Sequence, residues 1–303
     1  MTDGRQVGFV GLGAMGSRMA SRLVQDGFSV IVHDTDAAAC GALGDQGATV
    51  ASSARQVANE AATVLVSLPS PEASRAVALG EDGLGDGTAI KTYIDVSTTG
   101  ATVAGQIAAD LSARGIGCID APVSGGPGGA EAGTLTFMVS GDPGHIDAAR
   151  PIFDALGSRV IQVGEQPGQA QSAKVINNLL MAGALVLTGE AVSLGVKAGI
   201  DAETLLSIID TSTGQNNAAS TKFPRQVLTR QFSHGFRLGL LAKDLRLCLD
   251  EARTLSVPMP IGAAIEQIVD ICAAQSRPDA DCTEVVRVIE EWAGVTIAKQ
   301  PPQ

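Results

Sequence analysis

One lysine in this chain stands where a proton could be exchanged with the hydroxyl group of a bound molecule. Segment 168–178 has a helical pattern, and Lys174 and Asn178 are four residues apart, so their side chains share one helix face. Gln171 lies one turn before Lys174. Small and apolar residues surround the lysine, and partial burial would ease its deprotonation. The pattern suits general acid–base catalysis, and a lysine that reaches out to solvent is the alternative.

Two other short segments combine groups that could hold an acidic ligand. Ser124, Gly125 and Gly126 follow a predicted strand, and a hydroxyl beside two glycine N–H groups forms a small anion nest suited to a carboxylate. A plain glycine turn is the alternative there. Lys243 and Asp244 are adjacent in an apolar helical stretch, where opposite charges often form a structural ion pair.

The N-terminal segment has the spacing of a phosphate-binding turn. An apolar run at 7–10 leads into Gly11-x-Gly13-x-x-Gly16, and a helical pattern follows. Gly11 permits a tight turn, Gly13 leaves room for a pyrophosphate, and Gly16 allows close packing of helix on strand. Asp34 ends the second apolar strand, where a carboxylate can accept hydrogen bonds from both ribose hydroxyls. The segment therefore favours a dinucleotide site over a glycine turn without a ligand.

Composition narrows the classes of protein to which the chain can belong. Its 303 residues suffice for two domains, and the net charge of −11 argues against a nucleic-acid partner. The longest uninterrupted apolar run, 179–187, is too short to cross a membrane, and no signal peptide is visible. The five cysteines are widely spaced and suggest neither disulfides nor a metal site, as expected of a cytoplasmic protein.

Periodicity divides the chain into two parts. Strand signals at 6–10, 29–33, 62–67, 91–95, 116–119, 134–140 and 158–163 alternate with helical patterns at 14–26, 53–60, 71–78, 101–113 and 143–155. Helical patterns at 169–197, 201–210, 218–230, 237–254, 259–274 and 281–292 follow. The sequence predicts an α/β fold: an N-terminal Rossmann-type doubly wound sheet (1–165) followed by an all-α C-terminal domain for substrate binding and oligomerisation (166–303). The long apolar segment 169–197 favours a homodimer or homotetramer.

Together, the motifs resemble those of the β-hydroxyacid dehydrogenase family, the 3-hydroxyisobutyrate dehydrogenase-like enzymes. The resemblance covers nearly the whole chain in the family's order and spacing. It is carried by the segments Gly8–Gly16, Asp120–Gly126 with Gly133–Val139, Gly168–Asn178, and Lys243–Asp244. Imine reductases share this fold but usually lack the lysine, so Lys174 favours alcohol chemistry. The 6-phosphogluconate dehydrogenases have a longer helical part, so a length of 303 residues argues against them.

The resemblance implies a role for each matching residue. Lys174 would be the catalytic acid and base. Ser124, Gly125 and Gly126 would hold the substrate carboxylate, Asn178 would orient the substrate, and Lys243 with Asp244 would complete the site. The cofactor would contact Gly11, Leu12, Gly13, Ala14, Met15, Gly16, Asp34, Thr35, Leu68, Pro69, Ser97 and Lys243.

The implied activity is hydride transfer between a nicotinamide cofactor and a small 3-hydroxy acid of the 3-hydroxyisobutyrate type. Relatives that prefer NADP often carry arginine just after the strand-end position, whereas here Thr35 follows Asp34, so NAD is expected. The segment 212–217 keeps a Ser-Thr-Gly start, but its Gln-Asn-Asn could suit a substrate with more hydroxyls or a second carboxylate. Reduction of a short semialdehyde, such as tartronate semialdehyde or glyoxylate, and a non-catalytic nucleotide-binding role are the alternatives.

Overall fold

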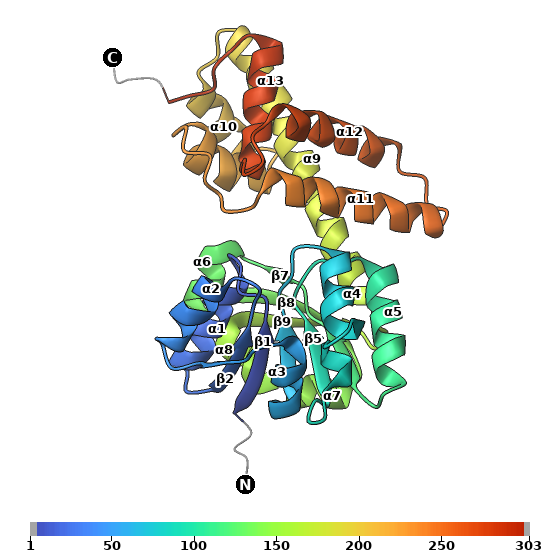
Figure 1. The fold of residues 1–303 in the computed structure, drawn as a ribbon. Coiled ribbons are helices and arrows are strands. Elements are labelled where there is room, and N and C mark those ends of the chain that lie inside the picture. The colour runs from blue at the N-terminus through green and yellow to red at the C-terminus, as the bar shows by residue number, and fades with distance from the viewer. Residues whose placement is uncertain (1–4, 300–303) are drawn as a thin grey trace. The chain divides into compact units, whose positions relative to one another are not determined.

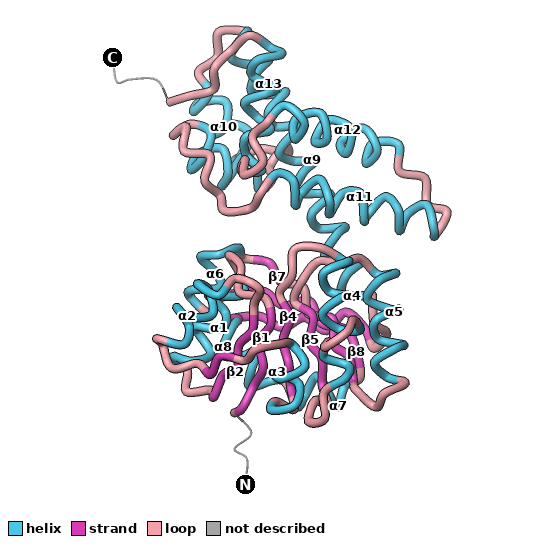
Figure 2. Tube along the Cα trace, in the orientation of Figure 1, coloured by secondary structure: helices cyan, strands magenta, loops and turns pink. Residues whose placement is uncertain are grey.

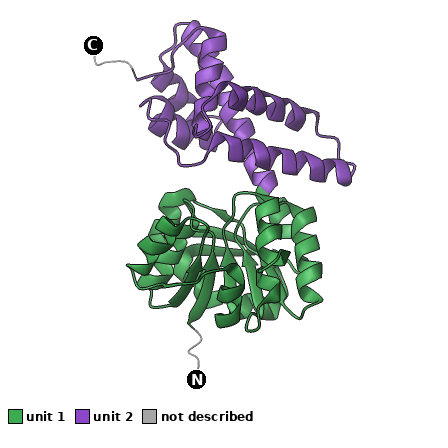
Figure 3. Ribbon diagram, in the orientation of Figure 1, with its two compact units in different colours: residues 1–174 green, residues 175–303 purple. Residues whose placement is uncertain are grey.

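The structure is a computed structural model that describes residues 5–299. It falls into two compact units, residues 1–174 and 175–303, which are coloured separately in Figure 3. Residues 1–4, where the sequence predicts no signal peptide, and residues 300–303 lie outside the described part. Each unit has its own hydrophobic core.

A nine-stranded sheet forms the centre of the first unit (Figures 1 and 2). Its strands follow the order β3-β2-β1-β4-β5-β6-β8-β7, and β9 pairs with β8. Neighbouring strands from β3 to β6 are parallel, whereas β8 runs antiparallel to β6 and β7. The strands are Gln6–Val10 (β1), Ser29–His33 (β2), Thr49–Val50 (β3), Thr63–Val66 (β4), Thr92–Asp95 (β5), Gly117–Asp120 (β6), Val123–Ser124 (β7), Leu135–Gly141 (β8) and Gly157–Gly164 (β9).

Apolar side chains point alternately to the two faces of this sheet, and helices cover both. Phe9 and Leu65 face one core, whereas Val10 and Val64 face the other. The first core takes side chains from α1 (Gly16–Gln25), α2 (Ala37–Gly44), α6 (Gly126–Ala132), α7 (Pro143–Ala148) and α8 (Arg150–Leu156). The second takes them from α3 (Ala54–Glu60), α4 (Pro71–Leu79), η1 (Leu84–Asp86) and α5 (Ala101–Ser112). This arrangement confirms the predicted Rossmann-type doubly wound sheet.

Helices and loops make up the described part of the second unit, apart from one isolated β-bridge between Arg237 and Asp281. Its elements are the continuation of α9 (Gln169–Lys197), then α10 (Ala202–Asp210), η2 (Ala218–Val227), α11 (Leu238–Thr254), α12 (Pro260–Gln275), η3 (Cys282–Glu284) and α13 (Val285–Ala293). Buried apolar residues of these helices form a single cluster, and α11 and α12 lie side by side (Figure 1). The all-α C-terminal part is thereby confirmed.

Helix α9 is long and apolar enough to cross a membrane by length and composition alone. Of its most apolar window, however, 56% is buried inside the protein, as in the core helix of a globular unit. Within the second unit, Val186 and Val192 belong to the hydrophobic core. The absence of a membrane partner therefore stays a prediction.

Several elements differ from the sequence-based expectations. The predicted helix at 143–155 is two helices, α7 and α8, because Pro151 lacks the N–H that would continue the hydrogen bonding of α7. The helices α2 and α6 were not predicted, because their alanine- and glycine-rich sequences carry no apolar periodicity. The helix expected at 218–230 is a π-helix over 218–227. The segment at 281–292 begins as a 3₁₀ turn.

The division between the units lies at residues 174 and 175, nine residues beyond the predicted boundary at 165. The reason is local: the first turn of α9 is hydrogen-bonded to loops of the sheet. The side chain of Gln171, for example, accepts hydrogen bonds from the N–H groups of Thr99 and Gly100. A change in periodicity marks where a helix begins, but it does not show which unit binds the first turn.

Candidate active site

The turn between β1 and α1 has three glycines, and the structure gives each a different physical reason. Gly11 has a φ of +91°, and a Cβ there would meet the carbonyl oxygen of Ser67. A Cβ on Gly16 would collide with the carbonyl oxygen of Gly11, so this glycine permits close packing. A Cβ on Gly13 would meet nothing within 4 Å, so no packing inside the protein requires glycine there. Open space at this position fits a cofactor pyrophosphate that approaches the backbone.

Asp34, at the end of β2, is held in place by this turn. Its Oδ2 accepts a hydrogen bond from the N–H of Leu12 at 2.5 Å, and its Oδ1 accepts one from the N–H of Asp36 at 2.8 Å. The Thr35 hydroxyl donates to the same Oδ1 at 3.3 Å. A carboxylate fixed in this way beside the glycine turn suits a ribose diol. The turn and Asp34 therefore fit a dinucleotide.

A second group of residues predicted to contact the cofactor, Leu68, Pro69 and Ser97, lies in the loops that follow β4 and β5. The N–H of Leu68 donates to Ser97 Oγ at 2.8 Å, and the N–H of Ser97 donates to Asp95 Oδ1 at 2.8 Å. Burial raises the pKa of Asp95, while its hydrogen bonds from Ser97 oppose that rise. Pro69 is exposed at the same edge. Strand order reverses between β1 and β4, and open α/β sheets bind ligands at such a point.

The predicted carboxylate nest lies between β7 and α6. Ser124 ends β7 and is half-buried, and Gly125 and Gly126 follow with φ values of +132° and +63°. Positive φ at two successive residues explains the glycines, because side chains disfavour this conformation. A Cβ on Gly126 would meet nothing within 4 Å, so open space adjoins the backbone there.

The helix that carries Lys174 is anchored by buried polar groups. Asp120, at the end of β6, accepts hydrogen bonds from the N–H of Gly168 and, at 3.1 Å, from the Ser140 hydroxyl. Ser140 Oγ accepts in turn from the N–H of Ala170 at 3.0 Å. These bonds satisfy N–H groups that the start of a helix leaves without partners. Burial raises the pKa of Asp120 to about 6, against the lowering effect of its hydrogen bonds.

Gln171 adds a second anchor one turn before Lys174. Its side chain is fully buried, and Nε2 donates to the Ser97 carbonyl at 3.1 Å. Its Oε1 accepts from the N–H groups of Thr99 at 2.9 Å and Gly100 at 3.3 Å. The loop that carries Ser97 is therefore tied directly to the turn that precedes the candidate catalytic lysine, which is itself half-buried.

Within the second unit, the structure brings three of the predicted residues together. Asn178 Nδ2 donates to Asp244 Oδ2 at 2.6 Å, and Lys243 Nζ lies 3.0 Å from Asp244 Oδ1. Asn178 and Asp244 are both buried. The ion pair left open as a structural alternative is present, and the same aspartate fixes the amide of Asn178.

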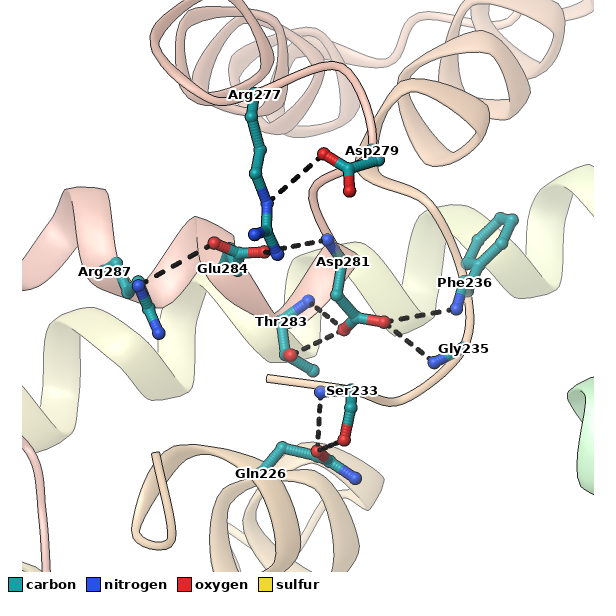
Figure 4. A network of polar contacts seen from close by, with 10 residues as sticks. All are labelled: Gln226, Ser233, Gly235, Phe236, Arg277, Asp279, Asp281, Thr283, Glu284 and Arg287. Atoms are coloured by element: carbon teal, nitrogen blue, oxygen red, sulfur yellow. Dashed lines mark hydrogen bonds and ion pairs between the residues drawn. The ribbon is translucent and has the colours of Figure 1, made fainter. Parts of the chain in front are cut away.

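Asp281 orders the loop that leads into α11 (Figure 4). Its Oδ2 accepts from the N–H groups of Gly235 at 2.8 Å and Phe236 at 3.3 Å, and its Oδ1 accepts from the backbone and hydroxyl of Thr283. Glu284 completes a capping box by accepting from the N–H of Asp281. Sequence reasoning missed this residue, although the Asp-x-x-Glu pattern at 281–284 was a usable signal.

Comparisons with known proteins cover almost the entire chain. Residues 6–164 match the family model of the NAD binding domain of 6-phosphogluconate dehydrogenase. Residues 168–289 match that of the NAD-binding domain of NADP-dependent 3-hydroxyisobutyrate dehydrogenase. An NAD-dependent L-serine dehydrogenase of Pseudomonas aeruginosa is 36% identical, over 96% of this chain and 99% of the relative. A 2-(hydroxymethyl)glutarate dehydrogenase of Eubacterium barkeri is 34% identical over 97% of both chains.

A solved structure is similar over the same extent. The 3-hydroxyisobutyrate dehydrogenase of Mycobacterium tuberculosis, solved with L-serine, superposes with a TM-score of 0.87 at 32% identity. The match covers 94% of this chain and 99% of that chain. Fold and sequence comparisons therefore agree over both units.

We predict that Asp120 gives the first unit a stability that depends on pH. Its pKa is 3.8 in a model peptide and about 6 in the fold. Between these values the native state binds more protons than the unfolded state, so the free energy of unfolding falls as pH rises. Asp120→Asn should remove this slope, which amounts to roughly 3 kcal/mol over the window. Chemical unfolding followed by circular dichroism from about pH 4 to pH 7 measures it.

The variant's amide adds only an offset that does not depend on pH, so the difference between the two curves is the readout. Asp147→Asn, at an exposed site on α7, is the control and should follow the wild type. Parallel curves for wild type and Asp120→Asn would show that Asp120 ionises alike in the folded and unfolded chains.

Proposed function

Because the chain belongs to the β-hydroxyacid dehydrogenase family, whose members oxidise CH–OH groups with a nicotinamide dinucleotide, we propose that it oxidises a small 3-hydroxy acid of the 3-hydroxyisobutyrate type with NAD. The observation that carries the proposal is the anchoring of α9. Gln171 and Ala170 bind loops at the sheet's ligand-binding edge, and Lys174 follows one turn later. A rigid helix is a precise support for a group that must meet a substrate proton.

In the proposed reaction each residue has one task. Ser124 and the N–H groups of Gly125 and Gly126 hold the substrate carboxylate. Lys174, as the free amine, accepts the proton of the substrate hydroxyl, and Asn178 orients that hydroxyl. When bound, the dinucleotide supplies a nicotinamide ring that accepts the hydride from the hydroxyl-bearing carbon. Gly11 to Gly16, Asp34, Thr35, Leu68, Pro69 and Ser97 are proposed to hold it.

The named substrates of the relatives support this substrate class. L-serine, 2-(hydroxymethyl)glutarate and 3-hydroxyisobutyrate share one core, a hydroxymethyl group on the carbon that carries the carboxylate. They differ in the third substituent of that carbon, so the shared core defines the proposed substrate class. The reverse direction, reduction of a short semialdehyde, would use the same residues. Assays in both directions separate the two candidates.

We also propose a homodimer or homotetramer in a reducing, cytoplasmic setting. Leu180, Leu187 and Leu194 recur at seven-residue spacing on α9 and are 70%, 58% and 72% exposed. Such a row on one helix face supports association. All five cysteines are free and buried, which supports the reducing setting.

Lys174→Arg should remove turnover while it leaves NAD binding nearly intact. Arginine keeps the positive charge but does not release its proton at working pH, so it cannot act as a base. The loss should reach about 10² to 10⁴ in kcat. NADH absorbance measures turnover and calorimetry measures NAD binding. Lys197→Arg, at the exposed end of the same helix, is the matched control. A Lys174→Arg enzyme that keeps most of its kcat would limit the lysine to an electrostatic role.

Ser124→Ala should raise KM for the hydroxy acid much more than KM for NAD. The variant removes one hydrogen bond to a charged carboxylate, which typically contributes about 1.5–3 kcal/mol. Steady-state kinetics with each ligand varied in turn provide the comparison. Equal weakening of both ligands would assign the loop to the cofactor or to the fold.

Cofactor preference should rest on Asp34 and Thr35. A 2′-phosphate would bring about −1.5 to −2 charges against the carboxylate and remove the hydroxyl donor that it binds. We therefore expect NAD to be preferred, mainly through KM. The double variant Asp34→Asn with Thr35→Arg should shift preference toward NADP, because a guanidinium can bind phosphate in a bidentate manner. The ratio of kcat/KM for the two cofactors is the measure, and a wild-type preference for NADP would refute the role of Asp34.

A further inference from the structure

Strand β5 ends in a buried acidic residue that has no task in the proposed reaction. Asp95 is 2% exposed and is the last residue of β5, two residues before Ser97. Its Oδ1 accepts a hydrogen bond from the N–H of Ser97 at 2.8 Å, and its Oδ2 accepts one from the hydroxyl of Tyr93 at 3.0 Å. An ionised carboxylate accepts on both oxygens in this way. Both donors are neutral, so they orient the carboxylate without cancelling its negative charge.

The neighbouring strand places a second acidic group beside Asp95. Asp95 and Asp120 are register partners on β5 and β6, and both are buried. Asp120 also accepts from neutral donors, the Ser140 hydroxyl and the N–H of Gly168. Burial is the main cause of the raised pKa of Asp120, and the negative charge of Asp95 adds to it. The carboxyl ends of β5 and β6 therefore carry buried negative charge.

Ser97 connects Asp95 to the part of the site where the reaction is proposed to take place. Its hydroxyl oxygen accepts from the N–H of Leu68, and its carbonyl accepts from Gln171 Nε2, three residues before Lys174. In the proposed reaction the hydride and the hydroxyl proton leave the same CH–OH group, so the nicotinamide ring must come close to the amine of Lys174. Asp95, Ser97 and Lys174 all belong to the first unit. The charge of Asp95 therefore belongs to the nicotinamide end of the proposed cofactor site.

We propose that Asp95 strengthens the binding of the oxidised cofactor, NAD⁺, relative to the reduced form, NADH. This inference rests on the proposed function. The oxidised nicotinamide ring carries a positive charge and the reduced ring is neutral, so a buried carboxylate attracts only the first. A unit charge about 10 Å from another, at an effective dielectric constant of about 20, changes a binding constant by roughly tenfold. Weaker binding of NADH would also ease its release after the hydroxy acid has been oxidised.

The test measures the dissociation constants of NAD⁺ and NADH by calorimetry without substrate. Asp95→Asn removes the charge with little change of shape, because its amide oxygen can still accept from Ser97 and its NH₂ group can donate to the Tyr93 oxygen. The ratio of the NADH to the NAD⁺ dissociation constant should fall about five- to twentyfold. Asp110→Asn, at an exposed position near the end of α5, is the control and should keep the wild-type ratio.

Tyr93→Phe separates the effect of charge from that of positioning. The variant removes one hydrogen bond to Asp95 but leaves the carboxylate in place. Burial raises the pKa of Asp95, so the measurements are made at about pH 8 to favour the ionised form. Tyr93→Phe should keep the NADH to NAD⁺ ratio even if it weakens the binding of both. If Asp95 only holds Ser97 in place, Asp95→Asn will also change both dissociation constants by one factor, and the inference fails.

A neutral analogue of the oxidised cofactor keeps the test possible if Asp95→Asn does not fold. Benzamide adenine dinucleotide has an uncharged ring of similar shape, and the wild type should bind it about tenfold more weakly than NAD⁺. Equal affinity for the two would overturn the inference. If the ratio falls in Asp95→Asn but no 3-hydroxy acid is oxidised, the role of Asp95 stands and the proposed reaction fails. If a 3-hydroxy acid is oxidised but the ratio is unchanged, the proposed function stands without the role of Asp95.

Discussion

The anchoring of one helix start is the interaction on which the site depends. Helix α9 begins among buried polar groups of the sheet unit. Asp120 accepts a hydrogen bond from the N–H of Gly168, and Ser140 accepts one from the N–H of Ala170. Gln171 donates to the Ser97 carbonyl. A helix start leaves N–H groups without partners, and burial makes such groups costly. Here they are satisfied by side chains near the ends of strands β6 and β8. These bonds fix the start of the helix and thereby the position of Lys174, one turn further along.

The same bonds connect the candidate cofactor and catalytic segments. Leu68 binds Ser97 through its N–H group, and Ser97 binds Gln171 through its carbonyl. The loops that follow β4 and β5 and the first turn of α9 thus form one hydrogen-bonded series, which ends on the helix of Lys174. A substitution at Gln171 would disturb both the loop at 97–100 and α9, even though its fully buried side chain does not reach solvent.

Much of this arrangement could be predicted, because local patterns encode it. The strand at 29–33 and the helix at 169–197 have the predicted bounds, since apolar periodicity marks them clearly. The glycine turn was recognisable by its spacing: a side chain at Gly11 or Gly16 would clash with backbone, and Gly13 leaves open space. The helices α2 and α6 were missed because small residues give no periodic signal, and α2 depends on Asp36, which caps it through two N–H groups.

The sequence alone could not predict the roles of residues whose hydrogen-bond partners lie far away along the chain. Asp120 and Gly168 lie 48 residues apart, and no local sequence pattern in either segment predicts their hydrogen bond. Asp281 similarly binds a loop 46 residues earlier. Gln171 was predicted to lie one turn before Lys174, but the sequence does not indicate its hydrogen bonds to Ser97, Thr99 and Gly100. Sequence can identify the reacting groups of such a site more readily than the groups that hold them.

The buried charged residues of the helical unit differ in the partners that stabilise them. Asp281 and Glu290 are buried, and each is satisfied by backbone N–H groups or by an arginine, as at Arg230. Their energetic cost is thereby offset within the fold. Lys222 has only a neutral amide, in a rare helix type that holds the two side chains together. The helical unit thus stabilises its buried charges in two ways: backbone N–H groups and an arginine serve the carboxylates, and the Asn217 amide serves Lys222.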